Sequence, residues 1–463
     1  MFKRKKPGLL VAWSLIIIGV NTQAAAADTY FDNFTPLTGS VPAGLLPEDK
    51  PLQLSSRNFS QRLIADRATQ LNLGEANSGK WDMITANETG PDAGRYLFNP
   101  FETSAAGVQR VDLQTGVTRT LVQPGAQGFV SGDASRWTPW GTYLTAEESW
   151  SGDGSTKGRL FELTNPVAAT GPGDANFIHR SVLPRVSHEG LAFDKDRSLY
   201  FIDELNGGSI YKYVSANSNA TSGDGYFAAG QSFALLVNGS GNANTTGSLT
   251  WVPITNPTGG ALAGVSVMNP DGTIDGRLSA DAVQGTDYQR PEDLEIKTLA
   301  NGDQMLFVAT TTTHEVYSIN LASHEVKLFV SRDTPDQATG LPVGAEFTSP
   351  DNLAIDAAGN IYIVEDQPGG LADIWIAQDI GNDGVAESMA RWASMSTIGA
   401  EPTGLYFDKF DPNTAYLNIQ HPDSLIDSTI RISAVPEPQI HAMLLAGFAL
   451  MGAIVRRRGK WLI

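Results

Sequence analysis

The amino-acid sequence predicts an all-β protein, a β-propeller of about six blades with loop insertions. Short segments with apolar residues at every second position recur along the chain in pairs, and no long segment of helical periodicity separates them. The 47 glycines and 25 prolines supply the turns that many short strands need. Radial repetition of small antiparallel sheets explains such a chain better than a parallel α/β sheet.

The clearest repeats are two hairpin units that resemble each other closely. Residues 188–203 contain the apolar segments LAF and LYFI, and residues 349–366 contain NLAI and IYIV. In each unit a turn separates two segments that alternate with a period of two, as in an antiparallel hairpin. Weaker copies bring the number of units to about six, and they lie at residues 96–113, 140–145, 290–309 and 401–419.

The N-terminus has the three parts of a secretory signal. Four basic residues at 3–6 precede an apolar run at 9–20, and small residues at 24–27 follow it with A-x-A spacing. We therefore predict a signal peptide at residues 1–27, which signal peptidase removes during export. The alternative is a permanent anchor helix, but the apolar run is shorter than the roughly 20 residues that span a bilayer.

Residues 28–80 are predicted to form an N-terminal extension with a short helix. Asn58 or Ser60 is a suitable N-cap for a helix over residues 61–71, in which Leu63, Ile64 and Leu71 lie on one face. The propeller itself is assigned to residues 81–434. Its stretches rich in Gly, Ser, Asn and Thr, at residues 215–225 and 238–249, are predicted surface insertions between strands.

The C-terminal residues 435–463 combine a short motif, an apolar segment and a basic end. Val435-Pro436-Glu437-Pro438 leads into apolar residues 440–455, and arginines 456–458 follow, which would stay in the cytoplasm. This order resembles the PEP-CTERM sorting signal. The resemblance implies a transmembrane segment held transiently in the inner membrane and processed by an exosortase, with delivery to the periplasm, outer surface or extracellular matrix. An ordinary tail anchor is the alternative.

Charge and cysteine content exclude several classes of function. With 50 acidic and 32 basic residues the net charge is -18, which disfavours a nucleic acid as partner. There is no cysteine, so disulfides, thiolate metal sites and a cysteine nucleophile are excluded. Clustered carboxylates remain as ligands for hard cations such as Ca²⁺.

Several repeat units place a carboxylate just before their first strand. These residues are Glu189, Glu292, Asp351 and Glu401. In a propeller this position faces the central channel, so the four carboxylates would converge and repel one another unless cations or protons compensate their charge. A multi-metal centre is therefore predicted, to which Glu147 and Glu148 are candidate additions. The alternative is that the acidic residues only form turns at strand entries.

Segments around these carboxylates resemble the PhoX-type alkaline phosphatases. The segment TPWGTYLTAEE at residues 138–148 is similar to a PhoX segment that ends in Thr-Cys-Glu-Glu. Further similar segments follow in the same chain order, namely Arg290-Pro291-Glu292-Asp293, residues 349–353, residues 401–404 and residues 418–422. The similarity spans roughly residues 81–425.

This resemblance implies a propeller that carries iron and calcium ions on its axis and hydrolyses phosphomonoesters. By position it implies the metal ligands Glu189, Glu292 and Asp351, with Glu147 and Glu401 as further candidates. It also implies that Arg290 contacts the phosphoryl oxygens, a role that suits a planar and always charged guanidinium.

One position departs from the family pattern. Ala146 stands where the PhoX segment has its cysteine, which is a ligand of the iron pair. Loss of a soft thiolate weakens iron binding more than calcium binding, so calcium is the expected cofactor and phosphatase activity is expected to be impaired. Two alternatives stay open: a non-catalytic calcium-binding propeller of the cell surface or exopolysaccharide matrix, and a calcium-dependent lactonase-like propeller.

Overall fold

The computed structural model describes residues 29–148, 156–367, 371–436 and residue 448. The predicted signal peptide at 1–27 lies outside the described residues, as does nearly all of the predicted sorting segment at 435–463. Within the described residues, no helix is long and apolar enough to cross a membrane.

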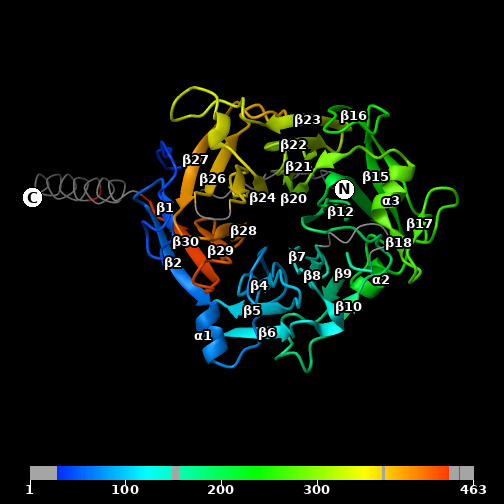
Figure 1. The fold of residues 1–463 in the computed structure, drawn as a ribbon, viewed down its shortest axis with the longest axis horizontal. Helices are drawn as coiled ribbons and strands as arrows, with labels where there is room; N and C mark the ends of the chain where they lie inside the picture. Colours follow the sequence, from blue (N-terminus) through cyan, green and yellow to red (C-terminus); the bar gives the residue numbers. More distant parts are fainter. Residues whose placement is uncertain (1–28, 149–155, 368–370, 437–447, 449–463) are drawn as a thin grey trace, which may run out of the picture.

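Six antiparallel blades surround one axis in the described part of the chain (Figure 1), which confirms the predicted all-β propeller. Blade 1 contains β3 (Thr85–Ala86), β4 (Tyr96–Pro100), β5 (Val108–Asp112) and β6 (Thr118–Val122). Blade 2 contains β7 (Arg136–Trp137), β8 (Tyr143–Ala146), β9 (Leu160–Leu163) and β10 (Phe177–His179). Blade 3 contains β11 (Leu191–Phe193), β12 (Leu199–Ile202), β14 (Ile210–Ser215) and β15 (Gly230–Val237).

The other three blades follow in chain order, and two of them take an additional strand from the N-terminal region. Blade 4 contains β20 (Pro291–Thr298), β21 (Gln304–Thr310), β22 (Glu315–Asn320) and β23 (Glu325–Val330). Blade 5 contains β24 (Pro350–Ile355), β25 (Ile361–Glu365), β26 (Asp373–Gln378), β27 (Ser388–Met395) and the edge strand β1 (Leu52–Leu54). Blade 6 contains β28 (Glu401–Phe407), β29 (Thr414–Gln420), β30 (Ser428–Ala434) and β2 (Phe59–Asp66).

Smaller elements connect or cover the blades. Strand β16 (Gly247–Pro253) extends blade 3 and pairs with β23 through Gly247 and Ser248, which joins blades 3 and 4 into one sheet. An insertion before blade 4 carries β17 (Val267–Met268), β18 (Ile274–Asp275) and α3 (Gly276–Ala282). The short pair β13 (Asn206–Gly208) and β19 (Tyr288–Gln289) links the ends of blades 3 and 4. The remaining short elements are α2 (Gly223–Tyr226) and the 3₁₀ turns Ala126–Gly128 and Gly344–Glu346.

The helix predicted over residues 61–71 is wrong for residues 61–66. These residues lie in β2, which pairs with β30 in an antiparallel ladder from Phe59 opposite Ala434 to Asp66 opposite Ser428. The helix α1 (Arg67–Asn72) begins only after Asp66, whose side chain accepts a hydrogen bond from the Thr69 backbone amide. Tertiary pairing with an open sheet edge outweighs the local helical pattern here. Residues 28–80 therefore supply strands to blades 5 and 6.

Hydrophobic side chains fill the spaces between neighbouring blades. Between blades 5 and 6, Tyr362 and Phe407 pack with their ring centroids 4.5 Å apart, and Trp392 and Phe31 extend the same cluster. All four side chains are buried. Such aromatic contacts bury large apolar areas, which fixes the blades relative to one another and to the axis.

Gly190 shows how closely the inner strands approach each other. An added Cβ at Gly190 would lie 2.5 Å from Asp293 Oδ1 and 2.5 Å from the Leu294 backbone nitrogen on blade 4. We expect Gly190→Ala to lower the free energy of unfolding by about 1–3 kcal/mol, because backbone must move to relieve the overlap. Thermal unfolding measures this change. Gly171→Ala is the control, since a Cβ there meets nothing within 4 Å; equal stability of both variants would contradict the close approach.

Candidate metal centre

The innermost strands of the blades begin at one end of the axis, and acidic side chains from these starts surround a cavity. Among the described residues the cavity has a volume of about 260 Å³. Its lining contains mostly carboxylates together with a few basic and amide groups: Lys80, Asp82, Glu102, Asp133, Glu148, Glu189, Glu204, Arg290, Glu292, Asp351, Asp366, Glu401, Gln420 and His421. The predicted convergence of acidic residues on the axis is thus present in the structure.

Glu189, Glu292 and Asp351 form the tightest group in this cavity, and we call them the carboxylate triad. They come from blades 3, 4 and 5, and one oxygen of each lies within 4.8 Å of the oxygens of the others. Glu189 and Glu292 are 4% and 1% exposed. Among the described residues, neither carboxylate oxygen of Glu292 accepts a hydrogen bond, although Oε1 forms an ion pair with Arg290 Nε at 3.1 Å. The triad therefore has unused acceptor capacity in a buried position.

Burial and mutual repulsion raise the pKa values of several carboxyl groups that line this cavity. Burial, followed by the charges of neighbouring carboxylates such as Glu292, raises the pKa of Glu189 and Asp351 well above the ordinary range. The pKa of Asp133 is raised for the same reasons, burial first and then the nearby Asp82. Carboxylates that resist ionisation when they are alone become strong ligands when a cation compensates their charge.

Glu401 lies in the same cavity but outside the triad. Its Oε1 accepts hydrogen bonds from Gln420 Nε2 at 2.8 Å and from His421 Nε2 at 2.9 Å. Burial raises the pKa of Glu401, but hydrogen bonds from Asp366 and His421 outweigh burial and lower it to about 2. Burial lowers the pKa of His421, but the bond to Glu401 outweighs it and raises the pKa to about 9. Glu401 and His421 therefore form an ion pair on the cavity wall.

Glu147 does not reach the cavity, whereas its neighbour Glu148 does. Glu147 is fully buried, and its Oε1 lies 2.6 Å from Arg159 Nη2 while its Oε2 accepts from Arg159 Nε at 2.8 Å. It also accepts a hydrogen bond from the Val130 amide. Successive side chains of an extended chain point in opposite directions, so only one of the two glutamates can face the axis.

Arg290 is held at the cavity by both its backbone and its side chain. It has a left-handed backbone conformation with φ 54°. Its amide donates to the Leu205 carbonyl at 3.1 Å, and its own carbonyl accepts from the Thr311 amide at 3.0 Å. The guanidinium pairs with Glu204 at 2.7 Å and with Glu292 at 3.1 Å. A fixed guanidinium beside the triad is suited to bind an oxyanion.

Sequence reasoning missed three acidic residues of the lining. Asp82, Glu102 and Asp133 come from blades 1 and 2, and burial is the largest cause that raises the pKa of Asp82 to about 7 and of Glu102 to about 8. Asp82 and Asp133 lie just before β3 and β7, and the triad residues likewise lie near the starts of β11, β20 and β24. These strands are two residues long, too short to show an alternating pattern. The recurrence of an acidic residue near the start of each blade was the sequence signal that could have revealed Asp82 and Asp133.

Ala146 faces a hydrophobic cluster and does not line the cavity. It is fully buried in β8 and belongs to the cluster that contains Leu144 and Leu160. Among the described residues, the cavity therefore offers carboxylate and amide oxygens, with His421 and Lys80 as additional nitrogen groups. No thiolate ligand is possible, because the chain has no cysteine.

Comparisons with known proteins agree with this architecture. Residues 104–423 match the family model of alkaline phosphatase PhoX, and residues 434–458 match that of the PEP-CTERM protein-sorting motif. No curated protein sequence matches the chain. A solved structure of Pseudomonas fluorescens PhoX in complex with vanadate, a transition state analogue, has a TM-score of 0.59 at 16% identity and covers 86% of this chain and 97% of that chain. Regucalcin, a calcium-binding protein from Agrobacterium tumefaciens, has a TM-score of 0.43 at 11% identity and covers 82% and 97%.

The similarity to the Pseudomonas fluorescens structure supports the propeller fold. The match to the family model shows in addition which protein family the chain belongs to. The match covers more than half of the chain and includes the triad and Arg290. The sorting motif implies export and processing by an exosortase. The resemblances predicted for both regions are confirmed, and this protein belongs to the PhoX alkaline phosphatase family and carries a C-terminal PEP-CTERM motif.

Proposed function

We propose that this protein is an exported phosphomonoesterase whose activity depends on hard cations bound by Glu189, Glu292 and Asp351. The observation that carries the proposal is the buried carboxylate triad beside the guanidinium of Arg290. Membership of the PhoX family supports a phosphatase. The motif at residues 434–458 supports transient anchoring in the inner membrane before exosortase removes the tail.

The donor set fits calcium better than iron. Carboxylate oxygens are the preferred ligands of Ca²⁺, and the chain lacks the thiolate that would favour a softer ion. Both oxygens of Glu292 are buried and accept no hydrogen bond within the described ranges, so a cation bound there would compensate a carboxylate that only Arg290 pairs with. When bound, the cation supplies Lewis-acid polarisation of the phosphoryl group and orients the attacking oxygen.

In this proposal, Arg290 binds and orients the substrate, and Glu204 positions Arg290. Glu204 pairs with Arg290 at 2.7 Å and directs its guanidinium toward the cavity, where a forked cation suits the oxygens of a phosphoryl group. The acidic lining repels a phosphate ester unless cations neutralise it. Substrate binding is therefore coupled to cation binding, and the metal-free protein is expected to bind phosphate poorly.

Arg290→Lys tests the role of the guanidinium. The variant keeps the charge but loses the forked donor geometry, so we expect KM for p-nitrophenyl phosphate and the inhibition constant of inorganic phosphate each to rise roughly tenfold. Steady-state kinetics with calcium present measure both values. Arg431→Lys is the control, because Arg431 lies on β30, which β29 separates from the innermost strand β28. Unchanged values in Arg290→Lys would show that Arg290 does not contact the phosphoryl group.

Elemental analysis of the purified protein, paired with a p-nitrophenyl phosphate assay with and without calcium, tests the proposal as a whole. Bound calcium together with calcium-dependent turnover is the expected result. Calcium without turnover would overturn the proposed activity and leave a non-catalytic calcium-binding propeller. Turnover that needs iron would overturn the choice of ion.

A further inference from the structure

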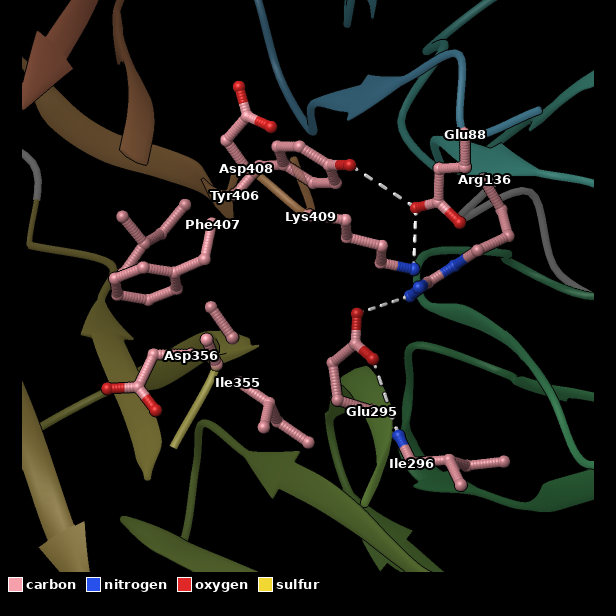
Figure 2. Close-up of a pocket in the computed structure, with 13 residues that line it drawn as sticks. Glu88, Arg136, Glu295, Ile296, Ile355, Asp356, Tyr406, Phe407, Asp408 and Lys409 are labelled. Carbon is pink, nitrogen blue, oxygen red and sulfur yellow. Dashed lines mark hydrogen bonds and ion pairs between the residues drawn. The ribbon is translucent and has the colours of Figure 1, made fainter. Parts of the chain in front are cut away.

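A second cavity lies at the opposite end of the innermost strands. Its volume is about 320 Å³, and Figure 2 shows the side chains that surround it. Strand β20 carries Glu292 at the metal cavity and Glu295 at this second cavity, and β28 carries Glu401 at the first and Tyr406 at the second. Three to five residues of strand correspond to roughly 10–16 Å, so the two cavities are separate sites.

The polar half of the second cavity consists of two ion pairs. Arg136 Nη2 lies 2.7 Å from Glu295 Oε1, and Lys409 Nζ lies 2.7 Å from Glu88 Oε1 (Figure 2). The hydroxyl of Tyr406 donates to the same oxygen of Glu88 at 3.3 Å. These residues come from blades 1, 2, 4 and 6, so the packing of the whole ring brings hydrogen-bond donors and acceptors side by side.

Arg136 has hydrogen-bonding capacity that these pairs do not use. Its Nη2 donates to Glu295, while Nε is buried and has no hydrogen-bond partner among the described residues. The side chain of Arg136 is 16% exposed. The unmet Nε donor is itself buried, so a ligand in the cavity would meet the exposed part of the Arg136 side chain instead.

The other half of the cavity is apolar. Ile296, Ile355, Leu405 and Phe407 contribute to its lining, and Tyr406 adds its ring beside its hydroxyl. Apolar walls with a few fixed polar groups are typical of small-molecule sites, and the volume lies at the small end of their range of about 300–1,000 Å³. The lining therefore favours a small ligand with one apolar face and several oxygen atoms.

We propose that this second cavity binds a neutral sugar residue, free or at the end of an oligosaccharide. Each sugar hydroxyl both donates and accepts, so it can bond a carboxylate and a neighbouring cation without breaking their pair. The C–H face of the ring would pack on the apolar wall. The lining has four carboxylates (Glu88, Glu295, Asp356 and Asp408) and two basic groups (Arg136 and Lys409), so its net negative charge would repel an anion. The inference does not rest on the proposed phosphatase activity.

Saturation-transfer NMR with the calcium-loaded protein tests the site. The probes are the methyl glycosides of glucose, galactose, mannose and N-acetylglucosamine, with phenylacetate as an amphipathic anion for comparison. We expect saturation transfer to at least one glycoside, with a dissociation constant on the order of 1 mM. Absence of transfer to all four glycosides would overturn the proposal, and binding of phenylacetate alone would assign the cavity to amphipathic anions instead.

Paired variants locate the binding. Ala357 is exposed and lines the cavity, whereas its exposed neighbour Ala358 does not. Ala357→Trp should abolish saturation transfer, and Ala358→Trp should retain it. Lys409→Met should weaken binding roughly tenfold through loss of a charged donor, and Lys50→Met should not. Both tryptophan variants should keep the far-ultraviolet circular dichroism spectrum and the cooperative thermal unfolding of the unmodified protein, which shows that they fold; glycoside binding that persists in Ala357→Trp would place the sugar elsewhere and overturn the assignment.

Discussion

Glu292→Gln is expected to lower kcat/KM for p-nitrophenyl phosphate at least about a thousandfold and to remove the rise in Tm that calcium causes. Glutamine has the shape of glutamate, so the cavity keeps its form. It loses the negative charge of Glu292, whose two oxygens are buried and accept no hydrogen bond from the part of the chain that the structure describes. Cation affinity and phosphoryl binding therefore fall together.

Two further measurements make this experiment decisive. Elemental analysis should show fewer calcium ions per chain in Glu292→Gln than in the unmodified protein. Glu325→Gln on strand β23 removes the same charge from an exposed position and should change neither activity nor metal content. A Glu292→Gln protein with full calcium content and full activity would exclude the triad as the metal site.

The stability of the metal-free protein is expected to fall as the pH rises from 6 to 9. Burial is the largest cause that raises the pKa of Asp82 to about 7, of Glu102 to about 8 and of Asp366 to about 9. Between their ordinary and raised pKa values, the folded protein binds more protons than the unfolded chain. The free energy of unfolding then decreases with pH, by roughly 1.4 kcal/mol per pH unit for each such proton.

Calcium should reverse this trend, because cations replace the protons that the carboxylates release. The rise in Tm on addition of calcium should be larger at pH 8.5 than at pH 6. Thermal unfolding in EDTA and in calcium at the two pH values measures the difference. Calcium titrations in buffers of different ionisation enthalpy should also show proton release. An equal rise in Tm at both pH values would mean that the acidic lining does not bind the cation.

The sequence predicted the acidic site residues of blades whose first strand is long enough to show an alternating pattern. It did not predict those of blades whose first strand has only two residues. The triad could be predicted because Glu189, Glu292 and Asp351 occupy equivalent positions before recognisable strands. Asp82 and Asp133 occupy the same position, but the two-residue strands that follow them carry no visible pattern. The choice between Glu147 and Glu148 depended on which side of an extended segment faces the axis, and that is set by the salt bridge with Arg159.

Pairing between distant segments could not be derived from local patterns. Residues 61–66 have the apolar spacing of a helix, yet they form β2 because the edge of β30 is available to them. The second cavity was also not predicted, since Arg136, Glu295 and Lys409 meet only when the ring is assembled. A pattern that recurs in every blade can be detected in a single sequence. A contact between residues of different blades occurs only once in the protein, so no repeated pattern reveals it.

The pairing of β2 with β30 also sets an order of events during export. No peptide bond closes the ring, which is joined by a ladder between strands that lie more than 360 residues apart in the chain. Val435 continues this ladder, because its amide donates to the Asn58 carbonyl at 3.0 Å. The sorting motif begins at residue 434, where β30 ends. For an exported chain we therefore expect the ring to close only after β30 has emerged from the translocation channel, when the segment with the sorting motif is the next to follow.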